Sequence, residues 1–178
     1  VEPEGGSLLG AEALPVPPVT GGHTVVAASH DGAILALDVK TGRKQWQAFT
    51  GGRIESSPAI WKDRVFAGSA DGHVYAFSLV DGKELWRLRV APEAGCMMLY
   101  DQLGSRWPVF GSPMVADGKV FAVAGCLHAL DGIHVIAADA ISGELQWERN
   151  DMTDAKGGSL MSESLIAGNG QFSWDKEF

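Results

Sequence analysis

Short runs rich in apolar and β-branched residues, separated by turn residues, recur along most of the chain. In the middle of the sequence they cover residues 64–69, 73–78 and 84–90, and Asp-Gly pairs break them. An Asp-Gly pair between apolar runs indicates a hairpin, because glycine adopts a positive φ without steric cost. Residues 57–61 add a short first strand, with Pro58 at its edge, where a missing N–H is tolerated. This pattern predicts four antiparallel strands in about 40 residues.

The same unit occurs three times, aligned on a tryptophan. Residues 36–46 read ALDVKTGRKQW, residues 76–86 read AFSLVDGKELW, and residues 137–147 read AADAISGELQW. None of these units shows the 3.6-residue periodicity of a helical repeat. A repeat of four-stranded antiparallel units predicts an all-β fold, a β-propeller whose blades follow one another along the chain.

The repeated tryptophan and glycine have a structural explanation in such a fold. A wide, flat indole on the outermost strand can wedge between neighbouring blades and bury on the order of 150–250 Å². The glycine four residues earlier lies in the preceding hairpin turn. The residues expected to make this contact between blades are Trp46, Trp86, Trp147, Gly42, Gly82 and Gly143.

The pattern A-x-D-x-x-T-G-x-x-x-W resembles the tryptophan-docking motif of the propeller repeat named after pyrroloquinoline quinone (PQQ). The first unit matches it fully, with Ala36, Asp38, Thr41, Gly42 and Trp46. The third unit has a serine for the threonine, and the second keeps the alanine, glycine and tryptophan. The sequence is thus similar to the PQQ-like β-propeller repeat family, which includes quinoprotein dehydrogenases and an outer-membrane assembly lipoprotein without quinone.

We expect residues 1–14 to be a linker or a strand of a preceding blade, and residues 15–178 to form a partial propeller. Its blades are expected at about 17–50, 57–90 and 112–150, with an incomplete fourth at 159–178. Propellers of the resembled family have seven or eight blades. The resemblance therefore implies that the chain is a segment of a longer propeller.

The third unit is enlarged in two places, around residues 91–110 and 126–131. In a blade with strands A to D, the connection from D to the next A and the B–C turn emerge on one face. Both enlargements are of this kind, and long loops in compact domains are often functional. The candidate ligand- or partner-binding residues on this face are Arg106, Trp107, Cys126, His128, Asp131 and His134. Arg106 and Trp107 could offer a cation and a flat ring to an anionic or sugar-like ligand; alternatively, Trp107 anchors the loop on the blade.

Cys96 and Cys126 leave three readings open: a disulfide between the two enlargements, two free thiols, or a metal site with methionine and histidine. The spacing C-x-H-x5-H matches no established ligand signature, so no metal site is assigned. Asp38 and Asp139 are expected to accept hydrogen bonds from turn N–H groups, and His73 is expected to be a solvated turn residue.

Composition excludes some classes of partner. The 178 residues carry a net charge of −8, and their 14 basic residues are scattered, so nucleic acid is not expected as a partner. No apolar run approaches the roughly 20 residues needed to span a bilayer, and no signal peptide is visible.

For function, we favour a non-catalytic scaffold that binds a protein, a small molecule or a carbohydrate through the long-loop face, without a cofactor. The alternative is a fragment of a PQQ-dependent alcohol or glucose dehydrogenase, which would bring PQQ and Ca²⁺. Against it, the chain lacks the adjacent cysteine pair that such enzymes often have. The resemblance also implies a periplasmic or otherwise exported protein.

Overall fold

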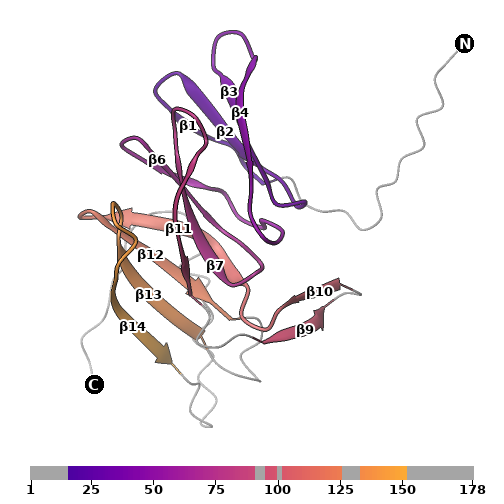
Figure 1. Cartoon of the computed structure of the whole chain (residues 1–178), viewed down its shortest axis with the longest axis vertical. Helices are drawn as coiled ribbons and strands as arrows, with labels where there is room; N and C mark the ends of the chain where they lie inside the picture. The colour runs from indigo at the N-terminus through magenta and orange to yellow at the C-terminus, as the bar shows by residue number, and fades with distance from the viewer. Residues whose placement is uncertain (1–15, 91–94, 100–101, 126–132, 152–178) are drawn as a thin grey trace, which may run out of the picture.

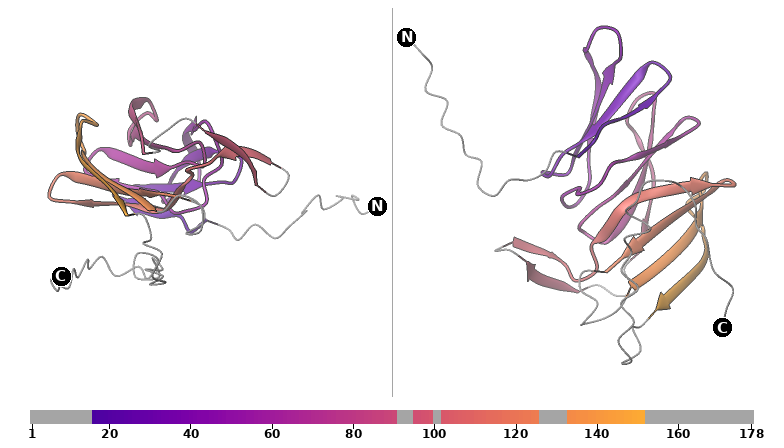
Figure 2. Two further views of the ribbon diagram at one scale, coloured as in Figure 1. Left: turned by 90° about the horizontal axis from the view of Figure 1, so that it is seen from below. Right: turned by 180° about the vertical axis from the view of Figure 1, so that it is seen from behind.

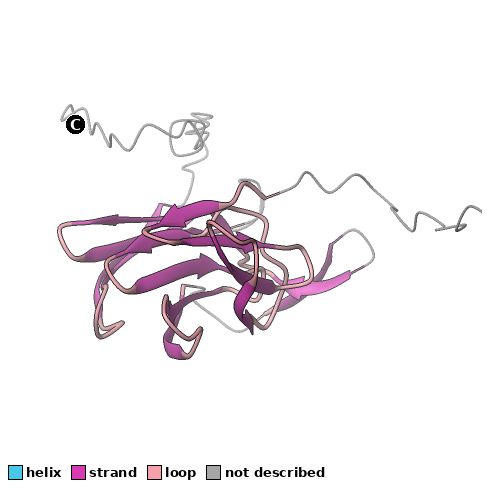
Figure 3. Cartoon of the chain, turned by 90° about the horizontal axis from the view of Figure 1, so that it is seen from above, coloured by secondary structure: helices cyan, strands magenta, loops and turns pink. Residues whose placement is uncertain are grey.

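The structure, a computed structural model, describes residues 16–90, 95–99, 102–125 and 133–151, and the regular structure of these residues is entirely β-strand (Figures 1 and 3). Within those ranges, no helix is long and apolar enough to cross a membrane. Three four-stranded antiparallel sheets follow one another in chain order (Figure 2), and in each sheet the strands are neighbours in sequence order. The predicted fold class is thereby confirmed.

The first sheet consists of β1 (Val19–Gly21), β2 (Thr24–Ala28), β3 (Ala33–Asp38) and β4 (Lys44–Phe49). The second consists of β5 (Ala59–Trp61), β6 (Arg64–Gly68), β7 (His73–Ser78) and β8 (Glu84–Arg89). The third consists of β11 (Val109–Ala116), β12 (Lys119–Ala124), β13 (Ile133–Asp139) and β14 (Leu145–Asp151). β6, β7 and β8 lie within one residue of the strands that the apolar runs predict, and β5 begins two residues later than the predicted 57–61.

The three sheets share one register around the repeated tryptophan. Ala36 lies opposite Trp46, Ala76 opposite Trp86, and Ala137 opposite Trp147, and in each pair the ladder shifts at the next residue. A bulge at the same place in every sheet bends the outer strand in the same way. The three indoles therefore start from equivalent backbone positions.

The turn before each outer strand is held by a polar side chain, as the sequence predicts for two of the three. Asp38 Oδ1 accepts hydrogen bonds from the backbone N–H of Thr41 (2.8 Å) and from its hydroxyl (2.7 Å). Asp139 Oδ1 likewise accepts from the Ser142 N–H (2.8 Å). These bonds stabilise the ionised carboxylates: the Thr41 hydroxyl mainly lowers the pKa of Asp38, and the Ser142 N–H that of Asp139.

Two apolar clusters hold the sheets together. One joins the first and second sheets through residues such as Val26, Ile34, Val65 and Phe77. The other joins the second and third sheets through Phe66, Val74, Val120, Ala122 and Ile136. Because the second sheet packs on both sides, both faces of β6 and β7 are buried, whereas β4 and β8 on the outside are mostly exposed.

Each indole that has a following sheet lies against the turn glycine of that sheet. A Cβ built on Gly82 would come within 2.4 Å of the Trp46 ring, and one built on Gly143 within 2.6 Å of the Trp86 ring. Trp46 Nε1 also donates a hydrogen bond to the Leu79 carbonyl (2.8 Å), and its side chain is 7% exposed. Trp147 differs: it is 42% exposed, since no described sheet follows it.

The connection between the second and third sheets differs from the expectation of a plain loop. It contains a two-stranded hairpin, β9 (Cys96–Leu99) with β10 (Gln102–Ser105), which extends to the side of the sheets (Figure 1). Its strands contain methionine, leucine and glycine rather than β-branched residues, and no Asn-Gly or Asp-Gly pair separates them. The third sheet also begins at Val109, three residues earlier than position 112.

The contact between indole and glycine predicts that two glycines with the same φ differ in how much their substitution lowers the free energy of unfolding. Gly143 and Gly118 both have φ of +74°, but a Cβ at Gly118 meets no atom within 4 Å. We expect Gly118→Ala to cost about 1 kcal/mol of unfolding free energy, for the left-handed backbone alone. Gly143→Ala should cost about 1–3 kcal/mol more, because the methyl group displaces the Trp86 ring. Urea denaturation of both variants measures this, and equal losses would contradict the packing.

Candidate binding face

The connections between sheets and the turns between the two middle strands of each sheet lie together. In the connection at residues 50–58, Thr50 N donates a hydrogen bond to the Gly32 carbonyl in the first sheet (2.9 Å). Its Arg53 carbonyl accepts from Ala70 N in the second sheet (2.8 Å). The Ala70 carbonyl in turn accepts from Ser105 N, at the end of β10 (3.2 Å). We call this continuous surface, formed by residues 29–32, 50–58, 69–72 and 95–108 where described, the loop face.

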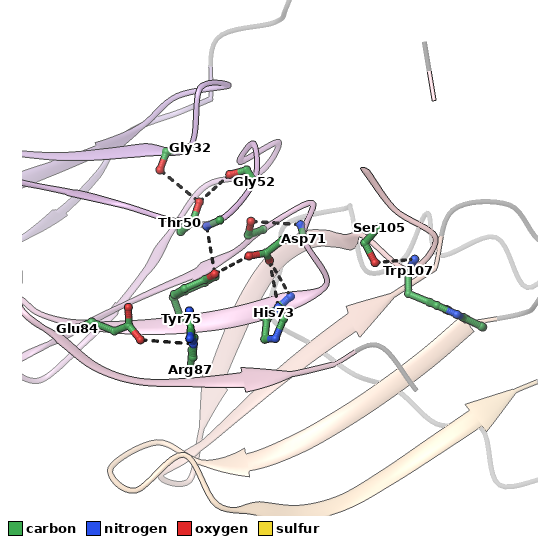
Figure 4. Close-up of polar contacts among 12 residues, drawn as sticks. Gly32, Thr50, Gly52, Asp71, His73, Tyr75, Glu84, Arg87, Ser105 and Trp107 are labelled. Carbon is green, nitrogen blue, oxygen red and sulfur yellow. Dashed lines mark hydrogen bonds and ion pairs between the residues drawn. The ribbon is translucent and has the colours of Figure 1, made fainter. Parts of the chain in front are cut away.

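Side chains reinforce this backbone network. The Thr50 hydroxyl donates to the Gly52 carbonyl (2.7 Å) and lies 3.2 Å from the Gly32 carbonyl (Figure 4). Ser56 Oγ donates to the Gly111 carbonyl on β11 (2.7 Å), so the first connection reaches the third sheet. A connection fixed at several points holds the loop face in one conformation.

The polar centre of the loop face is formed by Asp71 and Tyr75. The Tyr75 hydroxyl donates to Asp71 Oδ2 (2.5 Å) and accepts from Gly51 N (3.1 Å), as Figure 4 shows in part. The other carboxylate oxygen, Asp71 Oδ1, accepts from His73 N (3.0 Å) and lies 3.4 Å from His73 Nδ1. His73 was expected to be a solvated turn residue, but its Nδ1 is buried against this carboxylate.

Burial and the neighbouring carboxylate both favour the neutral phenol of Tyr75. The side chain is 2% exposed, and desolvation raises its pKa above the usual value near 10, with the hydrogen bond to Asp71 as the next cause. The backbone must approach closely here, because a Cβ on Gly51 would come within 2.4 Å of Asp71 Oδ2. Gly51, Asp71 and Tyr75 therefore form one packed unit rather than an open reactive group.

Arg106 and Trp107, which the sequence singles out, separate in the structure. Arg106 is exposed, and its backbone N–H donates a hydrogen bond to the Gly95 carbonyl (2.8 Å). Trp107 is 4% exposed and belongs to the cluster between the second and third sheets. Its ring is thus packed in the core, as in the anchor alternative, and does not offer a flat face to a ligand.

His134 is also buried, on β13. It is 4% exposed, and its Nε2 lies 3.5 Å from Glu148 Oε2 on β14. Cys126, His128 and Asp131 lie outside the described residues. Cys96 is exposed on β9, but a disulfide needs Cys126, so this pairing stays a prediction.

Sequence reasoning missed the centre around Tyr75. The corresponding position is Leu35 in the first sheet and Ile136 in the third, so Tyr75 is the one polar residue among three equivalent positions. The tyrosine at this position and the adjacent pair Gly51-Gly52 were the features of the sequence that indicated this polar centre.

The described ranges contain no group of three or more His, Cys, Asp or Glu side chains that could hold a metal ion.

Comparison with known proteins gives one family. The family model described as "Outer membrane protein assembly factor BamB" matches residues 3–100. The chain is 31% identical over 153 residues to a quinohemoprotein alcohol dehydrogenase of Comamonas testosteroni, covering 79% of this chain and 20% of that protein. It is 28% identical over 130 residues to outer membrane protein assembly factor BamB of Burkholderia pseudomallei, covering 73% of this chain and 28% of that protein.

Solved structures support the same fold. The crystal structure of the Comamonas testosteroni enzyme superposes with a TM-score of 0.65 at 22% identity, over 76% of this chain and 21% of that one. The computationally designed Ika4 protein superposes with a TM-score of 0.59 at 19% identity, over 82% of this chain and 79% of that one. The chain spans about a fifth to just over a quarter of the two curated relatives named above.

The buried phenol can be tested by titration, because the chain has only two tyrosines. In the folded protein we expect one tyrosine to ionise later than a free phenol, as followed by absorbance during an alkaline titration. Because the unfolded state ionises first, the free energy of unfolding should fall as the pH rises above about 10. Tyr75→Phe should remove the late transition and cost about 1–3 kcal/mol at neutral pH, since it removes the tyrosine hydroxyl that pairs with Gly51 N and with Asp71 Oδ2.

The matched control is Tyr100→Phe, which changes the other tyrosine. It should leave the late transition in place. If Tyr75→Phe keeps the late transition, the described hydrogen bonds of Tyr75 are wrong.

Proposed function

The chain belongs to the PQQ-like β-propeller repeat family, whose matching model carries the description "Outer membrane protein assembly factor BamB", and from this membership we propose that the chain is a non-catalytic scaffold. It binds a protein partner through the loop face and carries no cofactor of its own. The relatives that share its repeat include both assembly factors and dehydrogenases. The repeat therefore specifies an architecture, and the function depends on the face that the repeat presents.

The continuity of the loop face carries this proposal. Hydrogen bonds join it from Gly32 through Thr50 and Ala70 to Ser105, across all the connections that the structure describes. A surface already fixed in the free protein loses little conformational entropy on binding, so its contacts contribute more fully to affinity. Arg106 is exposed at one end of this surface.

Asp38, Asp71 and Asp139 have structural roles. Asp38 and Asp139 accept turn hydrogen bonds on the opposite side of the sheets, and both oxygens of Asp71 accept hydrogen bonds within the loop face. Carboxylates held in this way shape turns. The engaged carboxylate of Asp71 supports a role of the loop face in recognition rather than in proton transfer.

The second candidate is a fragment of a PQQ-dependent dehydrogenase, which the 31% identity to a quinohemoprotein alcohol dehydrogenase favours. Such an enzyme would need PQQ together with a cation such as Ca²⁺, which takes six to eight oxygen ligands. The carboxylates described here do not fit this requirement, because turn and tyrosine hydrogen bonds engage those of Asp38, Asp71 and Asp139. No reaction step is assigned to the described residues.

The same relatives support a location outside the cytoplasm. An assembly factor for outer membrane proteins acts at the envelope, and we propose that this chain is likewise periplasmic or exported.

Site-specific photocrosslinking in cells that express the native protein tests the scaffold. A benzophenone amino acid is placed at Arg106 on the loop face or, as control, at Lys40 in a turn of the opposite face, both exposed. We expect a discrete protein adduct from position 106 and none from position 40. Equal yields from both positions, or none from either, would contradict recognition by the loop face.

The dehydrogenase alternative has its own test. The purified chain is incubated with PQQ and Ca²⁺, and dye-linked oxidation of ethanol is measured. The scaffold proposal predicts no oxidation above the rate of free PQQ, and a protein-dependent rate would favour the alternative.

A further inference from the structure

Asp-Gly pairs form several of the turns, and such a pair can change its own covalent linkage. The glycine nitrogen attacks the side-chain Cγ of the aspartic acid, the protonated carboxyl loses water, and a succinimide ring forms. Water then opens the ring at either carbonyl, which gives back aspartate or leaves isoaspartate, whose main chain runs through the side-chain carbons. The water lost is regained, so no other reactant is needed. The reaction is favoured where the glycine N–H and the carboxyl are both free of hydrogen bonds.

In most of these pairs the glycine N–H already has an acceptor. The described residues contain four such pairs, Asp31-Gly32, Asp71-Gly72, Asp81-Gly82 and Asp117-Gly118. In the first three, the glycine N–H donates to the carbonyl of Ser29 (3.0 Å), Ser69 (3.1 Å) and Ser78 (2.9 Å), respectively. Each of these bonds must break before the nitrogen can react.

The carboxylates of the same three pairs are also engaged. Both oxygens of Asp71 accept hydrogen bonds within the loop face. The Ser29 hydroxyl mainly lowers the pKa of Asp31, and the Ser78 hydroxyl mainly lowers that of Asp81. These contacts favour the ionised carboxylate, from which water does not leave.

The fourth pair differs in every one of these respects. Asp117 and Gly118 form the turn between β11 and β12, with φ of +50° and +74°, and Asp117 is exposed. Among the described residues, no group donates to the Asp117 carboxylate, and the Gly118 N–H has no acceptor. A Cβ built on Gly118 would meet no atom within 4 Å, so the space beside this glycine is open.

The exposure of this turn does not come from its place in the last described sheet. By register, its counterparts in the second sheet are Lys62 and Asp63, in the turn between β5 and β6. The second sheet has a described neighbour on each side, and both residues are exposed there. A turn at this position therefore stays open to water when its sheet is covered on both sides.

We propose that Asp117 is a site of spontaneous isoaspartate formation, preferred over the other Asp-Gly pairs that the structure describes. The observation that carries this is the free glycine N–H beside a free carboxyl, a combination that the turns at Asp31, Asp71 and Asp81 do not offer. The site is a covalent modification of the scaffold and does not depend on the proposed function.

The modification reaches the packing between sheets through one hydrogen bond. The Gly118 carbonyl accepts from Ala140 N (2.9 Å), which joins this turn to the outer turn of the same sheet. Isoaspartate at position 117 adds a carbon atom to the main chain just before this carbonyl and displaces it from Ala140. The outer turn carries Gly143, on which the Trp86 ring lies. Isoaspartate therefore destabilises the third sheet at its contact with the second.

Heavy-oxygen labelling measures the reaction at each pair. The full, folded chain is incubated in mildly acidic buffer made with heavy-oxygen water and then digested with trypsin in ordinary water. Each opening of a succinimide brings in one heavy oxygen, which mass spectrometry locates by fragmentation. The tryptic peptide 107–119 has Asp117 as its only aspartate. We expect labelling there to be about tenfold faster than at the other pairs, the factor for one hydrogen bond that each of them must break.

The control is the same incubation of the chain unfolded in urea. All the pairs share the sequence Asp-Gly, so the preference for Asp117 should disappear when the turns are lost. Equal rates in the folded chain, or a faster rate at another described pair, would overturn the proposal. A preference that persists in urea would also overturn it, since the neighbouring sequence and not the turn would then be the cause.

A matched variant tests the effect on stability. Asp117→Gly cannot form the ring, and glycine tolerates the positive φ at this position. After the incubation, urea denaturation should show a lower free energy of unfolding for the unchanged chain, in proportion to its isoaspartate content, and no change for Asp117→Gly. Equal losses in both chains would contradict the effect on the third sheet.

Discussion

The packing of one indole against one glycine between consecutive sheets is the contact on which the architecture depends. Gly82 and Gly143 leave the space that the rings of Trp46 and Trp86 fill, and no other residue would fit without displacing a ring. Around this contact, apolar side chains of both sheets complete the two clusters. A sheet of four short strands cannot bury both of its faces alone, so each unit is stable only beside a neighbour of the same kind.

This dependence also explains the loop face. Because successive sheets are held at a fixed spacing, the connection after the first sheet can donate to the Gly32 carbonyl and accept from Ala70 of the second. The Gly51, Asp71 and Tyr75 unit forms across the same boundary. The proposed binding surface is thus a consequence of how the sheets pack. A substitution at the boundary between two sheets would alter this surface through the hydrogen bonds that cross the boundary.

The sequence predicted the fold well because its signals are local. Asp-Gly turns, alternating apolar runs and the spaced tryptophans recur at short range, so strand positions and register follow from them. The candidate site was harder to predict, because burial depends on contacts between sheets. For Trp107 the sequence left a ligand-binding ring and an anchor open, and the contacts between sheets place the ring in the core. Tyr75 lies in an apolar run that gives no sign of its hydrogen bonds, yet it carries the polar centre of the loop face. The hairpin β9–β10 was missed because methionine and leucine carry no strand signal without their partners.

A double-mutant cycle between Trp46 and Gly82 tests the central contact most directly. The free energy of unfolding is measured for the unchanged chain, Trp46→Ala, Gly82→Ala and the double variant. The account predicts that Gly82→Ala is more destabilising by at least about 1 kcal/mol when Trp46 is present than when it is replaced, because the added methyl group then has no ring to displace. Additive effects of the two substitutions would contradict it.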